Sequence, residues 1–355
     1  MTFKVVITMY NRTPSELTLD VIRNAGMDVE YIPARTENEV ITAAKDADVL
    51  MVGTVPHTTR KVLEALPNVK MIGRSGVGVD SIDLEAATEL GICATNTPGI
   101  NTSEVADHAM ALLLSITRKI PEQNAAMKAG AWSDRPAELD ALRGQLRRIA
   151  GNTVGIFGLG SIGKGFANRV RGFGPSKIIA YDPYVPQTTA DLIGVEMVDF
   201  DTLLAESDFL SVHSPATTET NEIFNIDAFT KMKPTAIFIN CARGPIVDEA
   251  GLQEALETGV IYAAGIDVTN IEPLDAESPL LKIDNLTISP HIAGTSEISG
   301  IAGATRWGEN AVNILTGKTL HGLANPEVVK RIAVMRAQGS SRWDGIPDPV
   351  TEAWS

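Results

Sequence analysis

Three side chains that could bind an anion or move a proton stand just after strand-like runs in the second half of the chain. Arg243 follows the first run, Glu272 lies a few residues past the second, and His291 comes directly after the third. The three runs are residues 236–240, 263–268 and 286–289. Because ligands bind beyond the carboxyl ends of parallel strands, these side chains are candidates for one site. Each alone has a structural alternative: a strand-end salt bridge, a helix cap and a buried histidine.

Together the three residue types suit one kind of reaction. Arg243 can hold a carboxylate through two parallel hydrogen bonds and keeps its charge at any working pH. His291 can donate or accept a proton near neutrality, and a neighbouring Glu272 would stabilise its protonated form. An anchored carboxylate beside a proton donor is what reduction of a 2-keto acid requires, provided that a bound group supplies a hydride.

A glycine-rich stretch has the pattern of a site for such a hydride carrier. An apolar run that begins at Val154 leads into glycines at 158, 160 and 163, a helical pattern follows, and a second apolar run ends on Asp182. Strand, Gly-rich turn, helix, strand and acid make up the dinucleotide-binding fingerprint. Gly158 permits a tight turn, Gly160 lets the backbone approach a pyrophosphate, and Gly163 lets the helix pack close to the strand.

Asp182 indicates which dinucleotide would bind. Its carboxylate is placed to accept hydrogen bonds from an adenosine ribose diol, and it would repel a ribose 2′-phosphate. The next residues are Pro183 and Tyr184, so no Arg or Lys follows that could hold such a phosphate. We therefore expect NAD as the cofactor rather than NADP.

Strand-like and helix-like segments alternate along nearly the whole chain, which predicts parallel sheets with helices on both faces. One series covers residues 4–97, and a second, with six strands, covers residues 154–290. A long amphipathic helix at 102–120 makes the first crossing, and a helix at about 295–316 carries the chain back. The expected division is 1–100 as the first part of a substrate domain, 101–291 as an NAD-binding Rossmann domain, 292–330 as the return segment of the substrate domain, and 331–355 as a C-terminal tail.

Composition and charge narrow the class of protein. The chain has 355 residues, 44% of them hydrophobic and 21% charged, which is ordinary for a globular protein. Its formal net charge of -14 argues against nucleic acid or an anionic membrane as the main partner. Two cysteines, Cys93 and Cys241, make neither a disulfide framework nor a zinc set, so we expect no metal and a cytoplasmic location. The N-terminus lacks a signal-peptide pattern, and no apolar run approaches the length of a bilayer span.

Over roughly residues 3–320, the chain resembles the D-isomer-specific 2-hydroxyacid dehydrogenases. The motifs that carry the resemblance are GRSGVGVD, NTPGIN with VADHAMALLL, GLGSIG, VHSPATTET, NCARGPIVDEAGL, DVTNIEP and SPHIAGTSE. The resemblance implies an α/β fold of two doubly wound parallel-sheet domains, a Rossmann coenzyme domain and a flavodoxin-like, discontinuous substrate domain, with the active site in the cleft. It also implies a homodimer formed through the coenzyme domain, with the long helix and residues 130–132 at the interface.

The same resemblance implies roles for the candidate residues. Arg243 would anchor the substrate carboxylate, and Glu272 would orient and tune His291, the acid/base. Further expected substrate contacts are the amides of Ser75, Gly76 and Val77. The expected cofactor-binding residues are Gly158, Gly160, Ser161, Ile162, Gly163, Asp182, His213, Pro215, Thr220, Cys241, Ala242, Asp267 and Gly294.

Some positions depart from the family pattern and bear on the substrate. Thr269 and Asn270 stand where an aromatic residue and an acid are usual, and Glu104 stands where a small residue is more common. The phosphoglycerate enzymes, whose Gly-rich turn this chain resembles most, carry an Arg in the loop after the third strand. Here that loop reads GTVPHTTR, with His57 and Arg60 close by but no Arg at the matching place. This lowers the expectation of 3-phosphoglycerate without excluding it.

The leading hypothesis is an NAD-dependent D-2-hydroxyacid dehydrogenase that acts as a 2-keto acid reductase on a small 2-hydroxy or 2-keto acid. Two alternatives share the scaffold: an NAD-sensing, corepressor-like binding protein, and a dehydrogenase of an unusual donor such as formate or phosphite. The presence of Arg243, Glu272 and His291 together favours the enzyme. Turnover on a panel of 2-keto acids with NADH would separate these possibilities.

Overall fold

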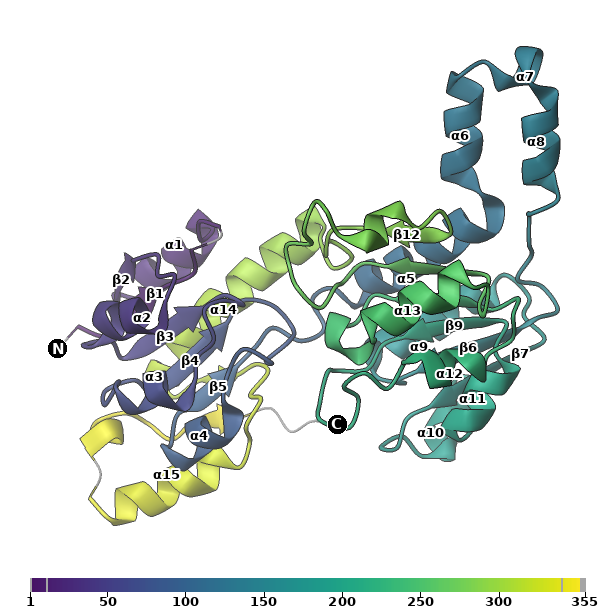
Figure 1. Ribbon diagram of the computed structural model, residues 1–355. Coiled ribbons are helices and arrows are strands. Elements are labelled where there is room, and N and C mark those ends of the chain that lie inside the picture. The colour runs from purple at the N-terminus through teal and green to yellow at the C-terminus, as the bar shows by residue number, and fades with distance from the viewer. Residues whose placement is uncertain (1, 11, 340, 352–355) are drawn as a thin grey trace. The chain divides into compact units, whose positions relative to one another are not determined.

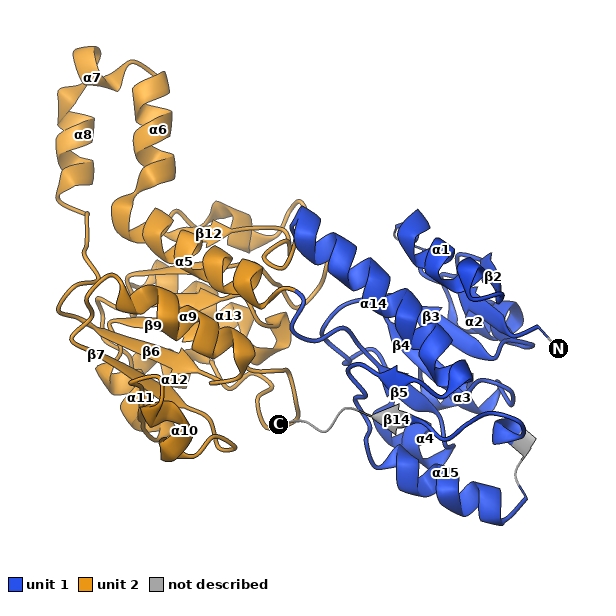
Figure 2. Ribbon diagram, turned by 180° about the vertical axis from the view of Figure 1, so that it is seen from behind, with its two compact units in different colours: residues 1–100, 296–355 blue, residues 101–295 orange. Residues whose placement is uncertain are grey.

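The computed structural model describes residues 2–10, 12–339 and 341–351, and the chain divides into two compact units. Unit 1 comprises residues 1–100 and 296–355, and unit 2 comprises residues 101–295 (Figure 2). The sequence pattern places the second crossing after His291, whereas the structure places it after Thr295. The reason is local: the chain continues as a turn past the last strand of unit 2, and helix α14 (Glu297–Thr316) begins only after the N-cap Ser296.

Unit 1 contains a parallel sheet whose described strands follow the order β2-β1-β3-β4-β5. The strands are β1 (Lys4–Ile7), β2 (Asp28–Tyr31), β3 (Val49–Val52), β4 (Met71–Arg74) and β5 (Cys93–Thr95). This is the flavodoxin-like doubly wound order, so the predicted fold class is confirmed for this unit.

Helices cover both faces of the unit 1 sheet because its strands are apolar on both sides (Figure 1). Val5 and Ile7 belong to one core and Val6 to the other, as the two-residue period of a strand requires. The first core is closed by α1 (Glu16–Asn24), α14 and α15 (Val328–Ala337), and the second by α2 (Glu37–Ala44), α3 (Arg60–Glu64) and α4 (Leu84–Glu89).

The C-terminal residues pack on unit 1, a point that the sequence pattern leaves open. Trp343 is fully buried, and its indole N–H donates to Gly91 O at 2.9 Å. Arg336 of α15 donates to Ile346 O at 2.6 Å and pairs with Asp348 at 2.9 Å. A short strand β14 (Val350–Thr351) pairs with β13 (Thr319–Leu320), which closes the segment onto its own unit.

Unit 2 contains a longer parallel sheet, whose described strands follow the order β12-β11-β10-β9-β6-β7-β8. The strands are β6 (Thr153–Phe157), β7 (Lys177–Tyr181), β8 (Glu196–Met197), β9 (Phe209–Val212), β10 (Ile237–Asn240), β11 (Ala263–Ile266) and β12 (Leu286–Ile288). This is the Rossmann order, and its topological switch point lies between β6 and β9. The predicted Rossmann class is confirmed. The six expected strands are present, and the two-residue edge strand β8 is additional because it is too short to leave a pattern.

Helices also cover both faces of the unit 2 sheet. On one face, α5 (Thr102–Arg118) and α9 (Ser161–Arg171) pack on a core that includes Val154 and Ile156. On the other face lie α11 (Phe200–Glu206), α12 (Ile226–Thr230) and α13 (Glu249–Glu257). The short helix α10 (Gln187–Asp191) lies beside β8.

Three helices form a hairpin that extends away from the body of unit 2 (Figure 1, Figure 2). They are α6 (Ile120–Lys128), α7 (Ala131–Asp134) and α8 (Pro136–Arg143). No residue of α6 or α8 is buried, and Trp132 between them is 72% exposed. Among all helices of the described residues, none combines the length and apolar character needed to cross a bilayer.

Candidate active site

The Gly-rich turn after β6 gives each of its three glycines a different environment. Gly158 has φ of +91°, and a Cβ there would lie 2.7 Å from Ser214 N. A Cβ on Gly163 would lie 2.2 Å from Gly158 O, so the helix can approach the strand only with glycine at that place. A Cβ on Gly160 would meet nothing within 4 Å. The chain itself therefore requires the first and third glycines, and the second leaves open space in front of helix α9.

That open space lies at an uncapped helix N-terminus. Gly160 is the N-cap of α9 and supplies no side chain to the helix. The first amides of a helix, here those of Ser161, Ile162 and Gly163, have no carbonyl partner within the helix. Free amides and the helix dipole favour an anion at this point, so the residues present fit the pyrophosphate of a dinucleotide.

Asp182, which follows β7, is tied to the same turn. Its Oδ2 accepts from Leu159 N and its Oδ1 from Tyr184 N, both at 2.9 Å. Each carboxylate oxygen still has a lone pair that can accept from a ribose hydroxyl. Tyr184 is 88% exposed, so the chain after Asp182 leaves that side open to solvent.

The loop after β9 brings His213 against the Gly-rich turn, since a Cβ on Gly158 would also lie 2.8 Å from His213 C. The His213 ring contacts Phe166 of α9, and its Nε2 is 2.9 Å from Ser211 Oγ. Its Nδ1 is buried without a hydrogen-bond partner among the described residues. Burial lowers the pKa of His213 to about 3, so the ring is neutral. Further along the loop, exposed Pro215 accepts from Thr220 Oγ1 at 2.8 Å through its carbonyl.

The segment after β10 is held by a buried amide that the sequence candidates do not include. Asn240 Oδ1 accepts from Ala242 N at 2.9 Å, and Asn240 Nδ2 donates to Arg243 O at 3.0 Å. Cys241 is buried, and burial together with the charge of Asp267 raises the pKa of its thiol, which therefore stays protonated. A polar residue that ends an otherwise apolar strand is the signal by which Asn240 could have been found.

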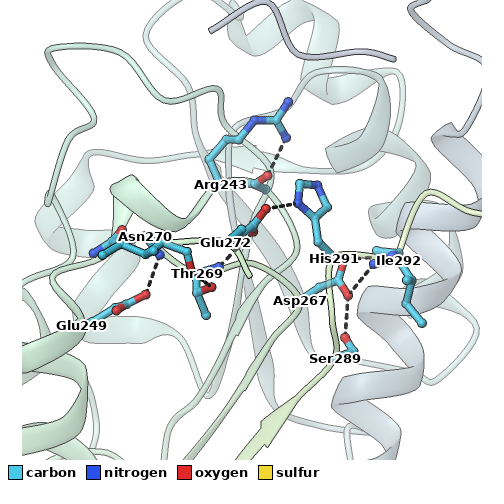
Figure 3. Close-up of polar contacts among 12 residues, drawn as sticks. Arg243, Glu249, Asp267, Thr269, Asn270, Glu272, Ser289, His291 and Ile292 are labelled. Atoms are coloured by element: carbon cyan, nitrogen blue, oxygen red, sulfur yellow. Dashed lines mark hydrogen bonds and ion pairs between the residues drawn. The ribbon is translucent and has the colours of Figure 1, made fainter. Parts of the chain in front are cut away.

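Glu272 and His291 meet directly. His291 Nδ1 lies 2.6 Å from Glu272 Oε2, and Thr269 N donates to Glu272 Oε1 at 3.2 Å (Figure 3). Burial alone would raise the pKa of Glu272, but the hydrogen bond and charge of His291, the Thr269 amide and the Arg243 guanidinium together hold it below its ordinary value. The carboxylate is therefore ionised and stabilises a protonated His291.

Arg243 completes this group. Its Nη1 donates to Ala242 O at 2.7 Å. Its positive charge is close enough to Glu272 to contribute to the lowered pKa of that carboxyl. Figure 3 shows the Arg243 guanidinium and the His291 ring near each other, with Glu272 beside the ring. The structure thus brings together the three side chains that the strand ends suggest.

Asp267, just past β11, is buried and holds the turn that carries His291. Its carbonyl accepts from His291 N at 2.7 Å, and its carboxylate accepts from Ile292 N at 3.1 Å and from Ala293 N at 2.8 Å. His291 has φ of 52°, in the left-handed region that residues other than glycine rarely adopt. The bonds to Asp267 offset that conformational cost. Gly294 follows, and a Cβ there would lie 2.3 Å from Asn101 Nδ2.

The second Gly-rich turn, in unit 1, follows β4. Gly76 has φ of +119°, and its carbonyl accepts from Thr97 N at 2.9 Å. Ser75 N donates to Val52 O at 3.0 Å, so this amide is already used by the chain. We therefore expect the amides of Gly76 and Val77, more than that of Ser75, to contact a substrate carboxylate.

The loop that departs from the phosphoglycerate pattern is also in unit 1. Arg60 pairs with Glu89 at 2.7 Å and lies 3.8 Å from Glu64. His57 is exposed. Arg60 is thus engaged with two carboxylates in this structure.

Comparisons with known proteins identify the family. A family model described as "D-isomer specific 2-hydroxyacid dehydrogenase, NAD binding domain" matches residues 110–293. The D-3-phosphoglycerate dehydrogenase of Archaeoglobus fulgidus is 39% identical over 311 residues, which are 88% of this chain and 58% of the relative. The hydroxypyruvate reductase of Thermotoga maritima is 42% identical over 264 residues, 74% of this chain and 83% of the relative. The chain thus spans less than two thirds of the phosphoglycerate dehydrogenases that it matches.

A solved structure gives the same picture for the fold. The glyoxylate reductase from Paecilomyes thermophila matches with a TM-score of 0.80 and 27% identity, covering 92% of this chain and 99% of that one. All three relatives are named as dehydrogenases or reductases, so the alternative of a cofactor-sensing binding protein is not favoured. The matching family model, the two relatives and the Rossmann unit all point to one family. This chain belongs to the D-isomer specific 2-hydroxyacid dehydrogenases, in the branch that includes the phosphoglycerate dehydrogenases.

Proposed function

We propose that this chain is an NAD-dependent D-2-hydroxyacid dehydrogenase that acts as a 2-keto acid reductase. The observation that carries the proposal is the 2.6 Å contact between His291 Nδ1 and Glu272 Oε2, within the electrostatic reach of Arg243. Because Nδ1 is bound to the carboxylate, Nε2 is the ring nitrogen left to face a substrate. His291 is 45% exposed, so a small acid can reach it from solvent.

In the proposed reaction, NADH when bound supplies the hydride. Arg243 holds the carboxylate of the keto acid and fixes its orientation. His291 Nε2 donates a proton to the oxygen that becomes the hydroxyl, and in the oxidative direction it takes that proton back. Glu272 holds the ring through Nδ1 and stabilises the charged imidazolium. In unit 1, the amides of Gly76 and Val77 are proposed to bind the substrate carboxylate as well.

The proposed cofactor contacts follow from the Gly-rich turn and the loops around it. The amides of Ser161, Ile162 and Gly163 suit the pyrophosphate, and Asp182 suits the ribose diol. Neutral His213, together with Pro215 and Thr220, is proposed to line the adenosine and nicotinamide sides with Cys241, Ala242, Asp267 and Gly294. NAD is proposed over NADP because the Asp182 carboxylate would repel a 2′-phosphate.

The substrate is proposed to be a small 2-keto acid. Relatives of this chain include a hydroxypyruvate reductase and a glyoxylate reductase, which supports keto acids of that size. The engagement of Arg60 with Glu89 and Glu64 weighs against a substrate phosphate held by that loop. Similarity to phosphoglycerate dehydrogenases keeps 3-phosphohydroxypyruvate in the panel to be tested.

We further propose a cytoplasmic homodimer, with no nucleic acid and no membrane as a partner. The hairpin α6–α8 supports self-association, because a helix pair with no buried face is marginal in water unless something packs on it. It exposes Ile120, Met127 and Trp132, which are 56%, 41% and 72% exposed. Light scattering should give the mass of two chains, and Trp132→Asp should lower it; a single-chain mass for the wild type would refute the dimer.

The activity is tested by mixing the protein with NADH and a panel of glyoxylate, hydroxypyruvate, pyruvate, 2-ketobutyrate and 3-phosphohydroxypyruvate. We expect loss of NADH absorbance with at least one member. NADH binding without turnover on any member would contradict the proposal and support the cofactor-sensing alternative. Formate and phosphite with NAD, run in parallel, test for the unusual donors.

A further inference from the structure

Helix α5 contributes a histidine that the proposed chemistry does not use. His108 Nε2 lies 2.8 Å from Ser289 Oγ, and Ser289 Oγ lies 2.6 Å from Asp267 Oδ1. His108 Nε2 is also 3.6 Å from the same Asp267 oxygen. The side chain of Asp267 has no solvent exposure, and that of His108 has 24%. Three polar side chains from separate parts of unit 2 thus form a continuous line that ends on a buried carboxylate.

The direction of the hydrogen bonds in this line follows from proton counting. An ionised carboxylate can only accept hydrogen bonds, so the Ser289 hydroxyl uses its one hydrogen to donate to Asp267. The Ser289 oxygen must then accept from His108, which requires a proton on His108 Nε2. The line therefore runs from His108 Nε2–H to Ser289 Oγ–H to Asp267 Oδ1.

Asp267 links this line of hydrogen bonds to His291, the proposed acid/base. Through its carbonyl and carboxylate, Asp267 accepts from three successive amides, those of His291, Ile292 and Ala293. These bonds hold His291 at its positive φ of 52°. Figure 3 shows Ser289 and Ile292 both directed at the Asp267 carboxylate, beside the His291–Glu272 pair. A shift of the carboxylate would pass directly to the backbone of His291.

We propose that His108 and Ser289 are positioning residues, which act through Asp267 to hold His291 in line with its substrate. The inference rests on the proposed function, since it concerns the placement of the acid/base. A satisfied structural histidine is the alternative for His108, and it would affect stability alone.

The test compares donors of similar reach. His108→Leu removes the donor, whereas His108→Gln keeps an N–H at about the position of Nε2. Ser289→Ala removes the hydroxyl, and Ser289→Thr keeps it. Thr117→Val on the same helix is a matched control. Thr117 is buried, and among the described residues its hydroxyl donates only within α5, to Leu113 O at 2.8 Å and Leu114 O at 3.3 Å.

We expect His108→Leu and Ser289→Ala to lower kcat for keto acid reduction by about ten- to hundredfold, since a misplaced reacting group costs that much in rate. The substrate KM should change less than kcat. His108→Gln and Ser289→Thr should recover most of the loss, and Thr117→Val should lower Tm with wild-type kcat. The inference would be overturned if the conservative variants lost as much kcat as the variants that remove the donor or hydroxyl. It would also be overturned if His108→Leu, assayed at a temperature well below its Tm, kept wild-type kcat.

Two further measurements keep the outcome decisive. In nitrogen-15 NMR of the wild-type protein, His108 should carry its proton on Nε2 in the neutral form; a neutral ring with the proton on Nδ1 would overturn the inference without any variant. His291→Ala separates the two proposals. If it keeps full turnover, the proposed function fails, whereas an inactive His291→Ala with a fully active His108→Leu refutes only the positioning role.

Discussion

The two Gly-rich turns of this chain both lie at the carboxyl ends of parallel strands, yet their backbones differ in what they could offer an anion. The turn after β6 leads at Ser161 straight into an eleven-residue helix whose N-cap offers no side chain. The turn after β4 leads into irregular backbone, and the next helix, α4, begins only at Leu84. One site would depend on a helix N-terminus, and the other on the backbone amides of a turn in which Gly76 has φ of +119°. Glycine spacing is thus a more specific prediction of an anion site where a helix follows at once, as after β6, than where none does, as after β4.

The largest effect should come from filling the tight contact at the third glycine of the unit 2 turn. In Gly163→Ala the new Cβ would lie 2.2 Å from Gly158 O, a backbone atom that cannot move without displacing β6 or α9. We expect a loss of at least about 2 kcal/mol in unfolding free energy, as for an overpacked core. NADH affinity, measured by fluorescence titration, should fall about a hundredfold, or about 2.7 kcal/mol.

Gly160→Ala is the matched control for that change. Its Cβ meets nothing within 4 Å, so the free energy of unfolding should stay near that of the wild type. NADH affinity should still fall, because the Cβ enters the space expected for the pyrophosphate. If Gly160→Ala bound NADH as tightly as the wild type, that space would not be the pyrophosphate site.

The corresponding change in unit 1 is Gly76→Ala. Its φ of +119° disfavours any side chain, by about 1–3 kcal/mol, and the new Cβ would also overlap Arg74 Nη1, so that guanidinium must shift. If the amides of Gly76 and Val77 bind substrate, the KM for the keto acid should rise about tenfold, or about 1.4 kcal/mol, while NADH affinity stays unchanged. A parallel loss of NADH affinity, or no change in KM, would contradict the proposal that the unit 1 turn binds substrate and the unit 2 turn binds the cofactor.

Asp182 gives a further test, because this acid lies at the unit 2 turn and could accept hydrogen bonds from the adenosine ribose. We expect NADH to be preferred over NADPH by at least about tenfold in kcat/KM. Asp182→Ser should narrow that ratio, and Asp182→Asn, which removes the charge at nearly constant size, should narrow it as well. An unchanged ratio in both variants would show that Asp182 does not face the ribose.

A further expected effect concerns stability in acid. His213 beside the unit 2 turn has a pKa of about 3 in the folded protein, against 6.5 in the unfolded chain. The unfolded state therefore takes up a proton as pH falls below 6.5 and the folded state does not. This group's contribution to stability is complete above pH 6.5 and is lost as pH falls toward 3, by up to about 1.4 kcal/mol per pH unit. Chemical denaturation between pH 7 and 5 should show a shallower decline in His213→Gln; equal slopes would contradict the buried, neutral state.

Much of this architecture can be predicted from the sequence, because its signals are local. The apolar runs give the strands, the fingerprint from Gly158 to Asp182 gives the Rossmann unit, and the positions of Arg243, Glu272 and His291 just past strands give the candidate site. Each depends on residue types at short, fixed spacing.

Other features depend on contacts between distant residues and leave no local pattern. Asp267 meets the amides of the His291 turn from another strand end, and Trp343 is buried against the carbonyl of Gly91, 252 positions away. Helices α6 and α8 bury no residue, so no packing against the core of unit 2 marks their positions. Asn240 and Ser289 are polar residues at strand ends, a signal that the sequence does carry, but without a fixed spacing that signal does not indicate their partners.

The central claim is that His291, held by Glu272, is the acid/base of the reaction. The most direct measurement is kcat for keto acid reduction in His291→Ala, taken together with NADH affinity and Tm in the same preparation. We expect kcat to fall by about 10²–10⁴, the usual contribution of a placed proton donor, with NADH affinity and Tm near those of the wild type. A variant that kept wild-type kcat would show that His291 does not donate the proton, and the account of this site would fail.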